Sequence, residues 1–386
     1  MNKILIFGCT PAAEFIVDRL IEVGGINEIC IVDRDKAKCD EVKKKHTSTK
    51  IRITTARADL SNAEGTKMML SITQPELIVN LAPAEYTMSV MKMALETGAD
   101  YIDGNLYNCD GDLLSEQFSM FGQFRQKGNT AIAGCGLNPS LLTSLVRQAL
   151  YESYDNITSA DIFGLNLAVD EFVQGEAAVV KEGDVAKIDR LSCTLKLEFG
   201  ETPEQILYPD DSPVVRDFLM EIPDIPNVRY FRSFEKNEED DDDTELADKL
   251  GMLSDEPLEI ADGISISPRQ FWIKLKQSKK VEKKLAGFCA AGALIKGIKA
   301  GEEKTELIAV KNDNDKAMAD YGMTGKQLFD AYAMLAGVVL LCNGRWKRPG
   351  VFTAAAFNPE IIMSEIKRHG LAVSEIVNPK AEVAES

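Results

Sequence analysis

Histidine is nearly absent from this chain of 386 residues. Only His46 and His369 occur, and His46 lies in the lysine-rich stretch KKKHTSTK. A Ser-His-Asp triad, a histidine metal site or a histidine acid–base catalyst is therefore poorly supported. The sequence also lacks the GxxxxGK[ST] loop that binds nucleoside triphosphates. What remains is redox chemistry in which an organic cofactor performs the difficult step and the protein positions it.

Closely spaced cysteines and long apolar runs are missing as well. None of the eight cysteines forms a Cys-x-x-Cys pair, so we expect reduced core thiols and no metal site. No uninterrupted run of eighteen apolar residues occurs, and the first residues, MNKILIFG, do not have the pattern of a signal peptide. We therefore expect no membrane association and a cytoplasmic location.

The charge balance is strongly acidic. Lys and Arg number 44 against 61 Asp and Glu, which gives a formal net charge of −17 at pH 7. The average field of such a protein repels a phosphate backbone, so we expect no nucleic-acid partner. The remaining composition, with 45% hydrophobic residues, is that of an ordinary globular protein, and the length suffices for two domains.

The first 135 residues alternate between apolar strands and amphipathic helices. Strands are expected around 4–7, 29–32, 51–54, 77–81, 101–103 and 130–133. Helices lie between them, for example at 12–23, 90–96 and 113–127. This alternation predicts right-handed crossovers and an α/β fold with a Rossmann-type, doubly wound parallel sheet.

From about residue 155 the pattern changes. Residues 191–199 alternate like a half-buried strand, the acidic run 238–243 indicates a solvated loop, and the small residues of 281–300 indicate a long helix. Thr324 and Gln327 fit a capping box at the start of a further helix. We expect an inserted α+β domain, followed by helices.

The turn after the first strand occupies the place of a dinucleotide-binding GxGxxG/A fingerprint. Gly8 supplies the tight turn, and Ala13 is small enough for helix and strand to pack closely. Thr10 replaces the second glycine, and Pro11 removes one amide donor at the first helical position. The helix N-terminus still offers amides and a dipole to a pyrophosphate.

The second strand ends in Asp33, twenty residues after Ala13. An acid at this position accepts hydrogen bonds from the adenosine ribose and repels a 2′-phosphate, which favours NAD as the cofactor. Arg34 follows immediately and keeps NADP open as the less favoured choice. The alternative for Asp33 is a turn residue at a strand end.

Further polar residues follow the carboxyl ends of later strands, which border the ligand crevice in such folds. Asp59 is expected in the wall of the adenine pocket. Asn80, Ala82 and Pro83 are expected near the nicotinamide ribose, followed by Tyr86. An ordinary strand–helix connection is the alternative for this loop.

Asp103 ends the next strand in the same crevice. After it, the segment GCGLNP places Asn138 as the cap of a helix with Pro139 in its first turn. A helix start that faces the crevice can hold a substrate carboxylate. A well-formed helix start without a ligand is the alternative.

Taken together, these segments resemble the saccharopine dehydrogenase family of the glutamate-forming (saccharopine reductase) type. The likeness rests on Gly8 to Ala13, on Asp33 and on four longer stretches: PELIVNLAPAEYTMSVMKMALETGADYIDGN, GCGLNPSLLTSLV, MTGKQLFDAYAMLAGVV and GVFTAAAFNPEIIMSEIKRHGL. The same family includes lysine 6-dehydrogenase and carboxynorspermidine dehydrogenase.

The resemblance implies a domain organisation. It predicts a dinucleotide-binding domain at 1–135, a substrate-binding and dimerisation domain at 136–322, helices at 323–372 that return to the first domain, and a tail at 373–386. A homodimer is implied as well.

The resemblance also implies an activity, namely NAD(P)-dependent oxidation or reduction at a carbon–nitrogen bond of an amino acid or polyamine, as in saccharopine and lysine metabolism. Tyr86, Asp103 and Asn138 then become the candidate catalytic residues. Asn138 and Ser140 depart from the Asp-Pro-Gly element of the family. Carboxynorspermidine or lysine 6-dehydrogenase activity is one alternative, and a dinucleotide sensor without turnover is another.

Overall fold

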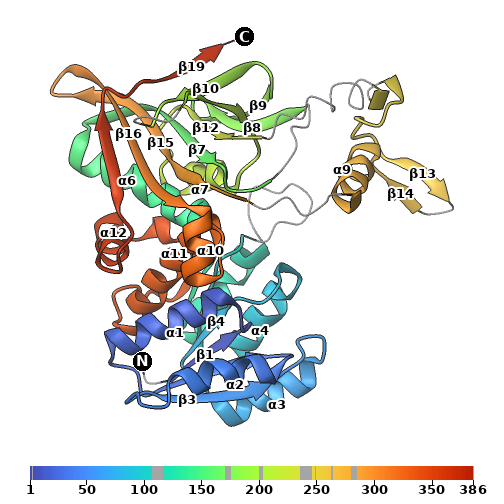
Figure 1. Cartoon of the computed structure of the whole chain (residues 1–386), viewed down its shortest axis with the longest axis vertical. Helices are drawn as coiled ribbons and strands as arrows, with labels where there is room; N and C mark the ends of the chain where they lie inside the picture. The colour runs from blue at the N-terminus through green and yellow to red at the C-terminus, as the bar shows by residue number, and fades with distance from the viewer. Residues whose placement is uncertain are drawn as a thin grey trace.

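The computed structural model describes residues 1, 3–106, 116–169, 175–199, 203–234, 246–247, 249–261, 264–279 and 285–385. Figure 1 shows two sheets, one in the lower half of the molecule and one in the upper half, with the helices α10 (Asn314–Tyr321), α11 (Gly325–Cys342) and α12 (Pro359–Arg368) near their junction. The predicted acidic loop 238–243 and residues 113–115 of a predicted helix lie outside the described residues.

The lower sheet contains seven parallel strands in the order β17-β6-β5-β4-β1-β2-β3. Six of them come from the first part of the chain: β1 (Lys3–Phe7), β2 (Glu28–Asp33), β3 (Arg52–Arg57), β4 (Leu77–Asn80), β5 (Asp100–Asp103) and β6 (Thr130–Ile132). The seventh, β17 (Gly350–Phe352), comes from near the C-terminus and pairs with β6. The predicted Rossmann-type parallel sheet is confirmed.

Alternate residues of β1 enter two different cores, which explains why helices cover both faces of the sheet. Ile4 and Ile6 pack with α1 (Pro11–Val23), α2 (Lys36–Lys45) and α11, whereas Leu5 and Phe7 pack with α3 (Ala63–Thr73), α4 (Thr87–Thr97) and α5 (Phe121–Lys127). A strand buried on both sides is typical of a doubly wound sheet.

The upper sheet is mixed and has ten strands, with the path β18-β16-β15-β7-β12-β11-β10-β19 and the β8–β9 pair beside it. Its strands are β7 (Asn156–Leu165), β8 (Glu176–Lys181), β9 (Asp184–Asp189), β10 (Cys193–Leu197), β11 (Gln205–Pro209), β12 (Val228–Arg232), β15 (Phe288–Lys299), β16 (Glu302–Asp313), β18 (Val373–Val377) and β19 (Ala381–Glu385). The helices α6 (Leu142–Ser153) and α7 (Pro213–Glu221) pack beside it. A small unit of β13 (Leu258–Ala261), β14 (Ile264–Ile266) and α9 (Pro268–Lys279) lies to one side in Figure 1.

Two sequence-based predictions are wrong here. The stretch 281–300 was expected to be a helix, but residues 288–299 form β15. The stretch 373–386 was expected to be a tail, but it contains β18 and β19, which pair with β16 and β10. A strand that is buried on both faces, as β15 is, gives an unbroken apolar run that periodicity cannot distinguish from a buried helix.

Helix α11 is largely buried and packs against α1, near the N-terminus, and α12, near the C-terminus. The predicted capping box is present: Thr324 accepts from the Gln327 amide, and Gln327 accepts from the Thr324 amide. Among the described residues it is the one helix long and apolar enough to cross a membrane, yet 78% of its apolar window is buried inside the protein. The helix is therefore apolar because it packs against α1 and α12 inside the protein.

Candidate functional site

Two neighbouring cavities lie at the carboxyl ends of the parallel strands. The first, which we call the β2 cavity, measures about 400 Å³, and its walls include Gly8, Asp33 and Tyr86. The second, which we call the α11 cavity, measures about 370 Å³ and lies between the start of α1, the ends of β4 and β5, and α11. Thr10, Leu81 and Ala82 line both cavities, so the two are adjacent. A dinucleotide crosses this edge of a Rossmann sheet.

The turn between the two cavities requires glycine at position 8. Gly8 has a φ of +93°, and a Cβ added there would lie 2.7 Å from the carbonyl oxygen of Leu81. Thr10 does not adopt a glycine conformation; instead it caps α1, with its hydroxyl accepting from the Ala13 amide at 3.3 Å. Pro11 occupies the first turn of α1, and Ala13 is buried against the core. The amides of Thr10 and Ala12 remain as candidates to contact a pyrophosphate.

Asp33 holds this turn in place. One carboxylate oxygen accepts from the Cys9 amide at 2.8 Å, and the other accepts from the Asp35 amide at 2.8 Å. Arg34 and Lys38 line the same cavity, and neither forms an ion pair with a described residue. The cavity thus offers both the carboxylate that the sequence predicted and two cations beside it.

The other predicted cofactor residues also lie at these two cavities. Asp59 and Pro83 line the β2 cavity, Asn80 lines the α11 cavity and Ala82 lines both. Hydrogen bonds from the hydroxyl and amide of Ser61 lower the pKa of the exposed Asp59 carboxyl. Asn80 is buried and fixed, since its amide nitrogen donates to the Tyr101 hydroxyl and its oxygen accepts from the Ala82 amide.

Asp103 lies behind the α11 cavity, whose lining includes its neighbours Gly104 and Asn105. The Asp103 carboxyl is fully buried and accepts from the Tyr101 hydroxyl at 2.6 Å, the Gln117 amide at 2.7 Å and the Gly134 amide at 3.0 Å. Burial raises its pKa to about 7, and these hydrogen bonds oppose the shift. In this structure Asp103 fixes the segment that leads out of the parallel sheet.

Asn138 does not cap a helix, contrary to the sequence-based prediction. Its backbone is extended, with a φ of −121° and a ψ of 114°, and the helical segment begins after Gly136. Its side-chain amide instead exchanges hydrogen bonds with the Ser212 hydroxyl at 2.7 and 3.1 Å. Asn138 therefore connects the segment after β6 to the loop before α7.

The structure does not bring the three candidate catalytic residues together in one cavity. Tyr86 lines the β2 cavity, whereas Asp103 and Asn138 line neither cavity. Their catalytic roles stay predictions.

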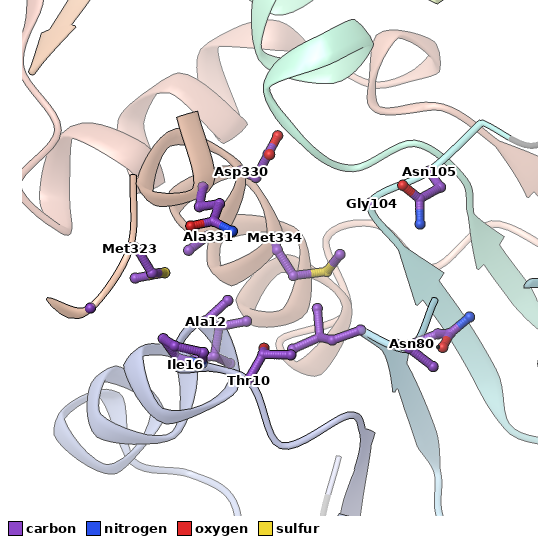
Figure 2. Close-up of a pocket in the computed structure, with 15 residues that line it drawn as sticks. Thr10, Ala12, Ile16, Asn80, Gly104, Asn105, Met323, Asp330, Ala331 and Met334 are labelled. Carbon is purple, nitrogen blue, oxygen red and sulfur yellow. Dashed lines mark hydrogen bonds between the residues drawn. The ribbon is translucent and has the colours of Figure 1, made fainter. Parts of the chain in front are cut away.

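Residues of α11 complete the site, and sequence reasoning did not select them. Met323, Gln327, Asp330 and Met334 line the α11 cavity. Figure 2 shows Met334 reaching from α11 toward the strand ends that carry Asn80 and Gly104. The capping box predicted the start of α11, and the resemblance implied that helices at 323–372 return to the first domain, but no local pattern indicated that these side chains reach the glycine turn.

Strand β12 carries two arginines, Arg229 and Arg232, which its alternation places on opposite faces of the upper sheet. Arg229 pairs with the buried Asp161 at 2.8 Å. Arg232 pairs with Asp210 at 3.0 Å, two residues before Ser212, which bonds to Asn138. Arg232 shares the face of Val228 and Tyr230, which pack in the same core as α6 and α11. Among the described residues no group of three or more His, Cys, Asp or Glu side chains could hold a metal ion.

A parallel sheet in this strand order, with a glycine turn and an acid after the second strand, defines a dinucleotide-binding Rossmann protein. The family comparison refines this class. Residues 4–132 match the family model of the saccharopine dehydrogenase NADP binding domain. The match covers the dinucleotide-binding part of the chain, and the predicted likeness to saccharopine dehydrogenase is confirmed.

Relatives extend the likeness to the whole chain. Carboxyaminopropylagmatine dehydrogenase of Synechocystis sp. is 24% identical over 98% of each chain, and carboxynorspermidine synthase of Vibrio alginolyticus is 21% identical over 90% of each. Saccharopine dehydrogenase (L-Glu forming) from Saccharomyces cerevisiae has the same fold, with a TM-score of 0.69 and 14% identity over 98% of this chain and 100% of that one. The predicted class, a saccharopine dehydrogenase-like oxidoreductase that uses a nicotinamide dinucleotide, is confirmed.

We expect Gly8→Ala to weaken dinucleotide binding by at least about tenfold, because a methyl group there meets the Leu81 carbonyl and the backbone conformation is strained. Binding can be measured by fluorescence of the reduced dinucleotide. Gly25→Ala is the matched control, since Gly25 also has a positive φ, of +78°, but no atom lies within 4 Å of the added Cβ. Equal affinity of the Gly8 variant and the wild type would contradict this reading of the turn.

Asp103 should make the fold less stable as the pH rises. The unfolded chain releases this proton near the ordinary value of 3.8, whereas the folded chain keeps it until about 7. The folded state binds more protons in between, so the free energy of unfolding should fall from about pH 4 to about pH 7. Asp103→Asn should reduce this slope in urea titrations, and the exposed Asp320→Asn should not. Identical slopes for wild type and Asp103→Asn would refute the prediction.

Proposed function

We propose that this chain catalyses the reversible reduction of a carbon–nitrogen double bond that joins an amine to a carboxyl-bearing carbon chain. The observation that carries the proposal is the pair of adjacent cavities at the glycine turn, one suited to an adenosine and the other walled by α11. The relatives named above act, by their names, on carboxylated polyamines. An amino-acid-derived secondary amine, as in saccharopine, is the other substrate of this type.

The residues fit a dinucleotide. Gly8 leaves space that a Cβ would fill, and the β2 cavity next to it has polar walls at Asp33 and Asp59. When bound, a reduced nicotinamide supplies a hydride to the carbon of the double bond. The amides of Thr10 and Ala12 would contact the pyrophosphate beside the Gly8 turn, and Asn80, Ala82 and Pro83 would border the ribose on the nicotinamide side.

The contribution of the protein is then mainly positional. Hydride transfer needs aligned partners and a site from which water is excluded. Met323, Met334 and Ile16 give the α11 cavity apolar walls. Arg232, held by Asp210, is the candidate to bind the substrate carboxylate from the upper sheet, because a guanidinium binds a carboxylate through two parallel hydrogen bonds.

The proposal is tested by following absorbance of the reduced dinucleotide in the presence of an amine and an aldehyde. The names of the relatives suggest the pair: disconnection of the carbon–nitrogen bond in a carboxyaminopropyl amine gives a primary amine such as agmatine and an amino-acid semialdehyde. We expect turnover with such a pair and none with either partner alone. Dinucleotide binding without turnover over a broad panel of amines would favour the sensor alternative.

We further propose NADP rather than NAD as the preferred dinucleotide, although Asp33 favours NAD in the sequence. Both oxygens of Asp33 already accept backbone amides, so the carboxylate has a structural task of its own. Arg34 and Lys38 lie beside it and can attract a 2′-phosphate. The name of the matching domain family points the same way.

The double variant Arg34→Ala, Lys38→Ala should therefore lose about tenfold or more in NADPH affinity while NADH affinity stays unchanged. Lys36→Ala is the matched control, because Lys36 is an exposed cation on the same helix that pairs with Asp40 and does not line the cavity. The proposal would be wrong if the wild type bound NADH more tightly than NADPH and if Asp33→Ala lost this difference in affinity. NAD would then be the preferred dinucleotide.

A further inference from the structure

Asp330 has the one charged side chain among the described residues that line the α11 cavity. The other walls are apolar or neutral and include Ile16, Met323, Met334 and Asn105. Figure 2 shows Asp330 on α11, with Met334 one turn further along the same helix. No described cation lines this cavity. The one charge on its described lining is therefore negative.

The Asp330 carboxylate is held in place by two donors. One oxygen accepts from the Leu137 amide at 2.7 Å, and the other accepts from the Lys326 ammonium at 2.7 Å. Gly136 allows this approach, since a Cβ there would lie 2.8 Å from the Asp330 oxygen. Each carboxylate oxygen has about two acceptor positions, so both retain capacity for a further donor. The side chain is 33% exposed and so remains accessible.

We propose that Asp330 is a specificity-determining residue that binds a cationic nitrogen of the substrate, an ammonium or guanidinium group distant from the reacting carbon. This inference rests on the proposed function and narrows its substrate class to amines with a second positive charge. The formal net charge of −17 supports it, because the average field of the protein attracts a polycation. An amine without a second cation gains nothing from Asp330.

Lys326 is the internal competitor for this position. Lys326 lies one turn before Asp330 on α11, and it does not line the cavity; its side chain is 44% exposed. The substrate cation shares the carboxylate with Lys326 or displaces it. Removal of the lysine charge therefore strengthens binding of a cationic substrate, while removal of the Asp330 charge weakens it. These opposite effects distinguish recognition of a cation from a merely structural ion pair, which both changes would weaken alike.

The experiment compares agmatine, which carries a distal guanidinium, with n-hexylamine, which does not, in the aldehyde-dependent oxidation of the reduced dinucleotide. We expect Asp330→Asn to raise the KM for agmatine at least about tenfold and to change that for hexylamine less than about twofold. Lys326→Met should lower the KM for agmatine. Asparagine can still accept from the Leu137 amide, which favours retention of the fold. Asp320→Asn removes one exposed charge outside the cavity and should behave as wild type.

Two controls keep the test decisive. Dinucleotide affinity and the melting temperature of each variant are measured first; a loss of dinucleotide affinity in Asp330→Asn would mean that Asp330 contacts the cofactor, which overturns the inference. Equal losses for the two amines would overturn it as well. If no amine is turned over, the proposed function fails, and the inference is then tested by binding alone. The measurement is the shift in melting temperature that agmatine gives in the presence of saturating dinucleotide. A shift that Asp330→Asn abolishes supports the inference; no shift, or a shift that is unchanged in the variant, refutes it.

Discussion

The close approach of the first strand to the fourth is the constraint on which the site depends. Gly8 donates to Val32 at 2.9 Å and Leu81 donates to Phe7 at 2.8 Å, so the turn is fixed between the ends of β2 and β4. With a Cβ at position 8 these backbones could not lie so close. The turn at Gly8 and the chain at Leu81 lie between the β2 cavity and the α11 cavity, so the two cavities are neighbours. A ligand that spans both must cross this turn.

The second half of the site depends on contacts between distant parts of the chain. Helix α11 lies on α1, and Asp330 reaches back to Leu137, 193 positions earlier in the sequence. Asn138, the next residue, bonds to Ser212, which lies between β11 of the upper sheet and α7. Two consecutive residues thus connect the segment after β6 to helix α11 on one side and to the loop before α7 on the other.

Local sequence patterns predicted the features that depend on neighbouring residues in the chain. The alternation of strands and helices gave the parallel sheet, and the positions of Gly8 and Asp33 gave the β2 cavity. Sequence reasoning failed where burial or distance removed the local signal. β15 is buried on both faces and has no alternation to detect, and β18 and β19 are short strands whose partners lie far back in the chain. Asp330 lies in a stretch that resembles the family, but no local pattern marks it as a site residue, because its place in the site depends on the return of α11 to the glycine turn.

The order of segments along the chain has a consequence for synthesis on the ribosome. Phe15, Ile16 and Leu20 of α1 bury their side chains in the core that α11 completes, and β17 supplies the last strand beside β6. Both arrive more than 300 residues after α1 has been made. The nascent nucleotide domain must therefore present an apolar surface while strands β7 to β16 of the upper sheet are translated. Chaperone dependence during translation, and sensitivity to truncation near the C-terminus, follow from this discontinuity.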